Sequence, residues 1–174
     1  MTKLFSFLAV SVISLSVFTA CAQESDKSKR PSPPAKVTAT TTKGTIISID
    51  YSQPSVKGRT IGKEIAPYGQ VWRTGANEAT TFEVSKDVVV NGKNLKAGKY
   101  GMYTIPGEKE WTVIFNKKTD LWGSDGYSEA DDALRVVAKP GKAPAFSEKM
   151  TFAVDPSGKV ALMWGDVMVD FKVD

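Results

Sequence analysis

The sequence predicts an all-β domain, an antiparallel β-sandwich or jelly roll of about ten short strands. Apolar residues recur at every second position in 47–51, 111–115 and 167–173, which is typical of half-buried antiparallel strands. Turn-forming pairs such as Asn91-Gly92 and Gly165-Asp166 separate these runs. The sequence has no internal repeat of about 20 to 50 residues, so it does not indicate a solenoid or a propeller.

The chain begins with a short apolar segment that ends at its single cysteine, Cys21. Lys3 gives a positive start, and residues 4–17 are apolar apart from serines. This length and these flanks are typical of a secretory signal and are too short for a permanent membrane span. The small residues before Cys21 resemble the lipobox of bacterial lipoproteins, which implies cleavage after residue 20 and acylation of Cys21. The alternative is an ordinary secretory signal with an accidental cysteine.

We therefore expect a signal peptide at 1–20, a lipidated Cys21 with a flexible polar tether at 21–35, and one β-sandwich domain at 36–174. The resemblance implies anchoring in the bacterial envelope, in the outer membrane and facing the periplasm or the cell surface. Removing the first 20 of the 174 residues leaves 154, and losing Lys3 lowers the net charge from +4 to +3. A mild, dispersed positive charge argues against nucleic-acid binding. The oligomeric state stays open.

The composition excludes several kinds of chemistry. The chain has no histidine, and its single cysteine is expected to carry lipid. Ser-His-Asp and Cys-His catalysis, Cys/His zinc sites, thiol redox chemistry and an internal disulfide are thereby excluded. No cofactor is expected, and the composition favours a protein that is not an enzyme.

Alternation and turn chemistry together place the strands. Asn91-Gly92 suits a type I′ hairpin and Gly165-Asp166 a type II′ hairpin, while Pro106-Gly107 closes a longer turn. We expect strands near 37–42, 45–51, 80–85, 87–90, 99–105, 111–116, 133–139, 149–155, 160–164 and 167–173.

Two stretches do not fit this succession of strands. Residues 52–79 form a long irregular insertion, and residues 117–130 are rich in Gly, Asp and aromatic residues. Long ordered loops in compact domains are often functional, so we look for a site there.

Several motifs of the chain resemble one known family. They are DYSQPSVKGR at 50–59, VWRTGANEAT at 71–80, AGKY at 97–100, TIPGE at 104–108 and WTVIFNK at 111–117. Together they are similar to the pattern of the family catalogued as domain of unknown function 2911, which occurs in exported bacterial proteins and lipoproteins. The resemblance covers the chain from about Val37 to the C-terminus. It supports a single domain there and implies no activity.

The segment 71–80 holds the strongest candidate binding residues. Arg73 is a planar bidentate donor, Asn77 donates and accepts, and Glu78 accepts hydrogen bonds. With Trp72 as a stacking surface, they could bind a sugar, a carboxylate or a peptide end. Arg59 and Lys99 are further candidates for the same region. Alternatively, an internal Arg73–Glu78 pair pins a polar loop, and Trp72 caps the core.

The second loop offers aromatic and acidic candidates. Trp122 and Tyr127 could form a sugar-stacking platform, or could cover one end of a sheet. Asp120, Asp125 and Glu129 are weak candidates for a calcium site, because their spacing does not match an EF-hand. A solvated acidic loop without metal is the alternative.

The most consistent interpretation is a lipid-anchored, non-catalytic domain that binds a small ligand, glycan or protein partner through 52–79 and 117–131. One alternative is a carboxylate-based hydrolase of envelope or extracellular carbohydrate, for which Glu64 and Glu78 are the only pair considered. Another is a structural envelope lipoprotein. A shallow aromatic platform would favour sugar binding, a deep cleft with two acids a hydrolase, and an exposed apolar patch a protein partner.

Overall fold

The computed structural model describes residues 26–174 and is nearly all β, with antiparallel sheets. This confirms the predicted fold class. The predicted signal peptide, the acylated Cys21 and the first tether residues lie outside the described residues. Within 26–174, no helix is long and apolar enough to cross a membrane.

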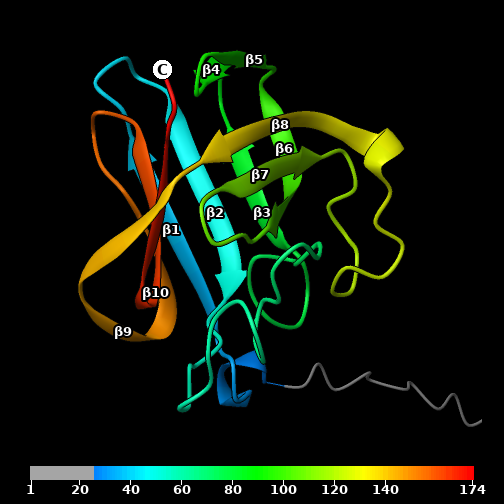
Figure 1. Cartoon of the computed structure of the whole chain (residues 1–174). Coiled ribbons are helices and arrows are strands. Elements are labelled where there is room, and N and C mark those ends of the chain that lie inside the picture. Colours follow the sequence, from blue (N-terminus) through cyan, green and yellow to red (C-terminus); the bar gives the residue numbers. More distant parts are fainter. Residues whose placement is uncertain (1–25) are drawn as a thin grey trace, which may run out of the picture.

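A six-stranded antiparallel sheet forms the larger layer, in the order β1-β2-β3-β6-β7-β8 (Figure 1). Apolar residues of β2, β3, β6 and β7 point into the core. The strands β6 and β7 are buried on both faces, because Tyr103 and Ile114 belong to a second, smaller apolar cluster. The strands are β1 (Pro34–Thr40), β2 (Ile46–Ser52), β3 (Thr80–Val84), β6 (Gly98–Ile105), β7 (Trp111–Asn116) and β8 (Asp132–Ala138).

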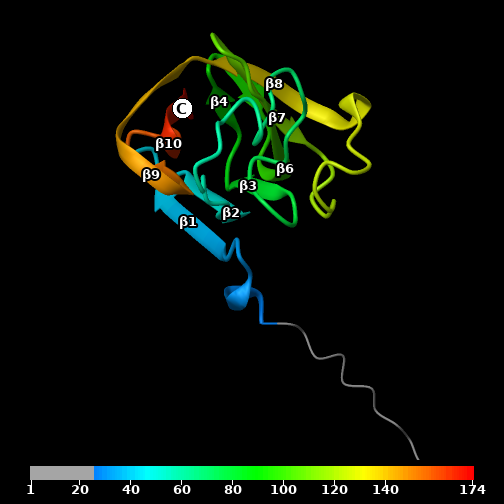
Figure 2. The same cartoon turned by 60° about the horizontal axis from the view of Figure 1, so that its bottom comes forward.

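The second layer is a hairpin of two long strands, β9 (Pro140–Val154) and β10 (Lys159–Lys172). β9 follows β8 almost without interruption, so the chain passes from one layer to the other (Figures 1 and 2). The core lies between the hairpin and the curved sheet. The rings of Phe82, Phe115 and Phe171, from β3, β7 and β10, lie with centroids 4.9 to 6.0 Å apart. This two-layer packing is that of a sandwich, while the jelly-roll alternative stays a prediction.

Three strand predictions need correction. The predicted strands 160–164 and 167–173 are one strand, β10, because Gly165 adopts a φ of +58° at a register shift rather than turning the chain. β9 begins at Pro140 instead of residue 149. β5 (Lys93–Leu95) was not predicted, although the turn before it was.

The hairpin of β4 (Val88–Val90) and β5 has the predicted turn. Asn91 and Gly92 have φ values of +43° and +82°, the left-handed conformation that a type I′ turn requires at both positions. The side chains of Asn91 and Lys93 bind the carbonyl oxygens of Val137 and Arg135 on β8. The hairpin thereby covers part of the free edge of the main sheet.

The irregular segment 52–79 lies at the end of the molecule where the N-terminal segment also runs (Figures 1 and 2). A 3₁₀ turn, η1 (Lys27–Lys29), precedes β1 there. The Gln53 amide donates to the Pro33 carbonyl (2.9 Å), and the Asn77 side chain donates to the Ser32 carbonyl (3.0 Å). Residues 26–33, which the sequence analysis included in the tether, therefore contact the domain.

Candidate functional site

The structure joins the two irregular loops through their backbones. The Ala79 amide donates to the Leu121 carbonyl (3.0 Å), and the Gly123 amide donates to the Asn77 carbonyl (3.1 Å). These bonds flank an antiparallel bridge between Glu78 and Trp122. We name residues 71–80 and 121–123 the loop junction. It brings together candidates that lie more than forty positions apart in the sequence.

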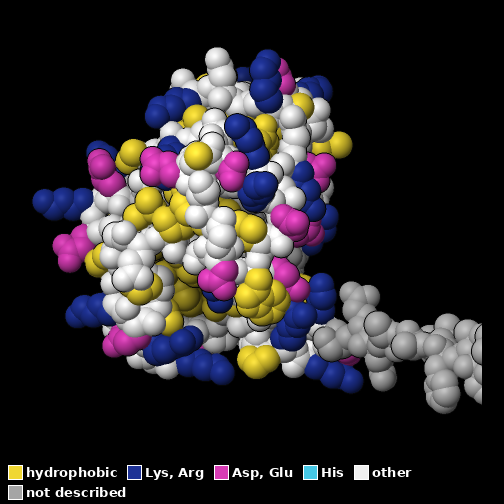
Figure 3. Space-filling view, turned by 90° about the vertical axis from the view of Figure 1, so that its right-hand side faces the viewer, with side chains coloured by type: hydrophobic (Ala, Val, Ile, Leu, Met, Phe, Trp, Pro, Cys, Tyr) yellow, Lys and Arg dark blue, Asp and Glu magenta, His cyan; other side chains and the backbone are white. Residues whose placement is uncertain are grey.

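The bridge determines how the side chains of Glu78 and Trp122 are directed. The two residues form a non-hydrogen-bonded antiparallel pair, the closer type, whose side chains lie next to each other on one face. Trp122 is 59% exposed, whereas the other three tryptophans are buried or partly buried. Figure 3 shows the face that carries loop 117–131, where hydrophobic side chains are exposed among charges of both signs. The junction therefore presents an exposed indole beside a carboxylate.

The loop before β3 is held in a conformation that costs energy. Thr74 and Asn77 have φ values of +53° and +58°, which is uncommon for residues other than glycine and most unusual for a β-branched one. Thr74 is fully buried, and its carbonyl accepts from the Thr80 hydroxyl (2.8 Å). The Trp72 indole N–H donates to the Gly75 carbonyl (3.1 Å). Such locally strained backbone, fixed by surrounding bonds, is frequent at functional sites.

Glu78 is paired with the N-terminal segment. One guanidinium nitrogen of Arg30 lies 3.0 and 2.9 Å from its two carboxylate oxygens, and the Lys27 ammonium lies 3.3 Å from one of them. A hydrogen bond from Glu78's own backbone N–H to its carboxylate, and then those from Arg30 and Lys27, lower the pKa of the Glu78 carboxyl against the opposing effect of burial. The predicted alternative of an Arg73–Glu78 pair is therefore wrong.

Lys99 lies on β6 near the same ion pairs. An open pocket of about 230 Å³ is lined by Lys99, Glu78, Arg30 and Lys27, together with Asp50 and Tyr51 among others. Glu78 thus connects two features, the exposed indole of Trp122 and a pocket with three cationic side chains. Lys99, a predicted candidate for this region, therefore lies beside Glu78 in the structure.

Two other candidates have roles within the fold. The ring of Trp72 stacks on Trp164 (5.3 Å, 12°) and meets Trp111 edge to face (6.3 Å). Trp72 therefore caps the core, which is the alternative that the sequence predicted to a stacking surface for ligands. The Arg59 guanidinium binds the carbonyls of Ser55 (2.8 Å) and Val56 (3.1 Å), which stabilises its own turn. Neither side chain belongs to the exposed part of the loop junction.

Arg73 lies against Gly123. A β-carbon built on Gly123 would be 3.1 Å from a guanidinium nitrogen of Arg73, so the guanidinium packs closely on this glycine. Gly123 has a φ of +67° and begins the turn in which the Asp125 amide donates to the Trp122 carbonyl (3.2 Å). A residue with a side chain at 123 would strain this turn and displace the arginine.

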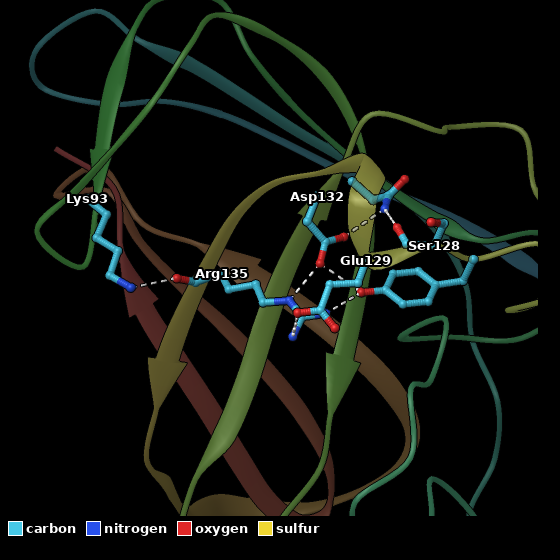
Figure 4. Close-up of polar contacts among 7 residues, drawn as sticks. Lys93, Ser128, Glu129, Asp132 and Arg135 are labelled. Atoms are coloured by element: carbon cyan, nitrogen blue, oxygen red, sulfur yellow. Dashed lines mark hydrogen bonds and ion pairs between the residues drawn. The ribbon is translucent and has the colours of Figure 1, made fainter.

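Tyr127 belongs to a separate polar cluster (Figure 4). Its hydroxyl donates to Asp132 (2.8 Å) and accepts from Arg135 (2.7 Å), while its ring packs on buried Tyr103 (5.0 Å). Glu129 pairs with Arg135 (3.1 Å). Tyr127 therefore covers the sheet, which is the alternative that the sequence predicted to a sugar-stacking role. Trp122 is the exposed aromatic residue of this loop.

The weak metal candidates do not come together. Within residues 26–174, no group of three or more Asp, Glu or Cys side chains is placed to hold a metal ion. This includes Asp120, Asp125 and Glu129.

Sequence reasoning missed Lys27, Arg30 and Gly123. Arg30 lies in a polar, proline-containing segment that carries no apolar pattern, so nothing marked it as a partner of a residue 48 positions away. Gly123 is one of several glycines in the loop, and only the arginine packed against it distinguishes it.

The fold and the junction define an all-β domain with a candidate binding surface made by two loops. A family model described as "Protein of unknown function (DUF2911)" matches residues 32–173, and the chain belongs to this family. The match confirms the resemblance of the sequence motifs. No curated protein and no solved structure matches the chain.

Proposed function

We propose that this protein is a lipid-anchored binding protein of the bacterial envelope, and that its loop junction binds saccharides without catalysis. The observation that carries the proposal is the bridge that sets the exposed indole of Trp122 beside Glu78. An aromatic ring bordered by a few fixed polar groups is a common ligand surface, since the ring buries apolar area and the polar groups orient the ligand.

The polar groups beside Trp122 are already fixed. Arg30 and Lys27 hold the carboxylate of Glu78, and the lowered pKa keeps it ionised and able to accept hydrogen bonds from hydroxyl groups. The strained loop positions Glu78 before any ligand arrives, which reduces the entropy lost on binding.

The carboxylates argue against the hydrolase alternative. A glycosidase needs a general acid whose pKa is raised. Backbone hydrogen bonds at Glu64 itself and at Thr60 lower the pKa of Glu64, and the pKa of Glu78 is lowered as well. The Thr60 amide at Glu64, and Arg30 with Lys27 at Glu78, stabilise the ionised carboxylates, so neither group is suited to act as the general acid.

The exposed apolar side chains argue against a broad protein-binding surface. The large exposed hydrophobic residues lie on different elements: Ile46 on β2, Tyr68 and Trp122 in separate loops, Val137 on β8 and Phe146 on β9. A protein interface needs a contiguous apolar patch, and within the loop junction Trp122 is the one large hydrophobic residue that is exposed.

The test compares the native protein with Trp122→Ala by calorimetric titration with neutral oligosaccharides, for example a galactose trimer. Phe146→Ala is the matched control, because Phe146 is 58% exposed but lies on β9. We expect Trp122→Ala to abolish binding and Phe146→Ala to leave it unchanged. Equal binding by the native protein and Trp122→Ala would refute the proposed site.

A further inference from the structure

Arg73 differs from the other arginines of the chain. The guanidinium groups of Arg30, Arg59 and Arg135 all donate to carboxylate, carbonyl or hydroxyl oxygens. Among residues 26–174, Arg73 has no carboxylate within ion-pair distance, and its buried Nε has no hydrogen-bond acceptor. A buried donor without an acceptor destabilises the fold, so native structures rarely retain one without a reason.

Glu78, the one acid of segment 71–80, does not supply the missing acceptor. Glu78 lies five positions from Arg73, but its two oxygens are held by Arg30 and Lys27. The backbone carbonyl of Arg73 accepts from the Thr80 amide (3.2 Å), which fixes the main chain, whereas the Nε of its guanidinium has no hydrogen-bond acceptor in residues 26–174. Arg73 thus keeps its hydrogen-bonding capacity within a rigid loop.

The position of Arg73 connects it to the indole platform. Its guanidinium packs on Gly123, the residue directly after Trp122, and the side chain is only partly buried. A ligand ring stacked on Trp122 would therefore have a cationic group close to its edge. Guanidinium groups bind planar carboxylates through two parallel hydrogen bonds, which gives both strength and orientation.

We propose that Arg73 is the anion-binding residue of the loop junction, and that the ligand is a saccharide carrying a carboxylate, such as a uronic acid. The inference rests on the proposed function and names the ligand class of that site. Trp122 provides the stacking surface for the sugar ring, and Arg73 binds the carboxylate.

The experiment titrates the purified protein with a galacturonic acid trimer and with a neutral galactose trimer. Arg73→Met retains the aliphatic contact with Gly123 and removes the charge. Arg59→Met is the matched control, because Arg59 binds only carbonyls of its own turn. We expect the native protein and Arg59→Met to prefer the acidic trimer. Arg73→Met should bind that trimer about tenfold or more weakly and the neutral trimer unchanged.

A folding control accompanies these titrations. Since Arg73 has no partner within residues 26–174, Arg73→Met should unfold at a temperature close to that of the native protein. The preference of the native protein for the acidic trimer should also weaken as salt is added, because the binding is ionic.

The outcomes separate this inference from the proposed function. If Arg73→Met keeps the native preference for the acidic trimer while Trp122→Ala loses both ligands, Arg73 is not the anion-binding residue and the saccharide site stands. If Trp122→Ala binds both trimers normally, the proposed site is wrong. If the native protein binds neither trimer, both proposals are refuted.

Discussion

Single residues show where local chemistry is sufficient to predict structure and where it is not. Asn91-Gly92 forms the predicted turn, because only adjacent residues decide whether the chain adopts positive φ. The partners of Glu78 and Arg73 could not be predicted, since these depend on a segment near residue 30 and on a loop near residue 123. Residue types therefore indicated the candidates, and distant contacts determined their roles.

At the same scale, two tyrosines predict a dependence of stability on pH. Burial raises the pKa of Tyr103 to about 12, and burial with a hydrogen bond to Asp132 raises that of Tyr127 to about 12. The folded state thus favours the neutral form of both tyrosine side chains. Their contribution to the free energy of unfolding is complete below pH 10, the ordinary pKa, and is lost as the pH rises toward 12.

Chemical denaturation between pH 9 and 12 and tyrosinate absorbance measure this effect. We expect stability to fall above pH 10, and Tyr127→Phe to make the fall less steep. Ionisation of every tyrosine near pH 10 in the native protein would contradict the assignment.

At the scale of elements, alternation predicted most strands and failed where a strand is irregular. Residues 140–148 contain Pro140 and Pro144, which lower strand propensity, yet they extend β9 because β10 supplies a partner. Gly165 was predicted to end a strand and instead forms a bulge within β10. Turn chemistry and bulge chemistry both use a glycine with positive φ, so sequence alone does not separate them.

The bulge makes a prediction about Gly165. It has a φ of +58°, and a β-carbon there would lie 3.3 Å from Ile61. Gly165→Ala should therefore lower the free energy of unfolding by about 1 to 3 kcal/mol. Gly141→Ala is the control in the same hairpin, because its φ is not positive and its nearest contact is 4.0 Å away. Urea denaturation should show a change within about 0.5 kcal/mol for this variant. Equal effects of the two changes would argue against the bulge.

At the scale of the whole molecule, the sequence predicted the class of fold but not the contact between the N-terminal segment and the loop junction. The N-terminal residues 26–33 contact the loop junction instead of remaining a free tether. Only five positions separate Asp26 from Cys21, so at most about 18 Å of chain lies between the proposed lipid and the domain. The proposed anchor would therefore hold the end of the molecule that carries the loop junction close to the membrane.

The proposed anchor is tested by Cys21→Ser. Stable anchoring takes more than one acyl chain, and diacylation of Cys21 would be sufficient without further membrane contact. We expect the variant to lack lipid by mass spectrometry and to leave the membrane fraction or accumulate with its signal uncleaved. A correctly cleaved, unacylated variant that stays in the membrane fraction would contradict the lipoprotein assignment.

The most direct test of the account follows the indole signals of the four tryptophans by NMR while the galactose trimer is added, with Trp122→Ala assigning the signal of Trp122. Trp122 is exposed, and Trp111 and Trp164 lie in the core. If the loop junction binds the trimer, the NMR signals of the Trp122 indole and of the amides of residues 77–79 and 121–123 shift together, while the indole signals of Trp111 and Trp164 do not move. An unchanged Trp122 signal, with the trimer either unbound or bound elsewhere, would contradict the assignment of the loop junction as the binding site.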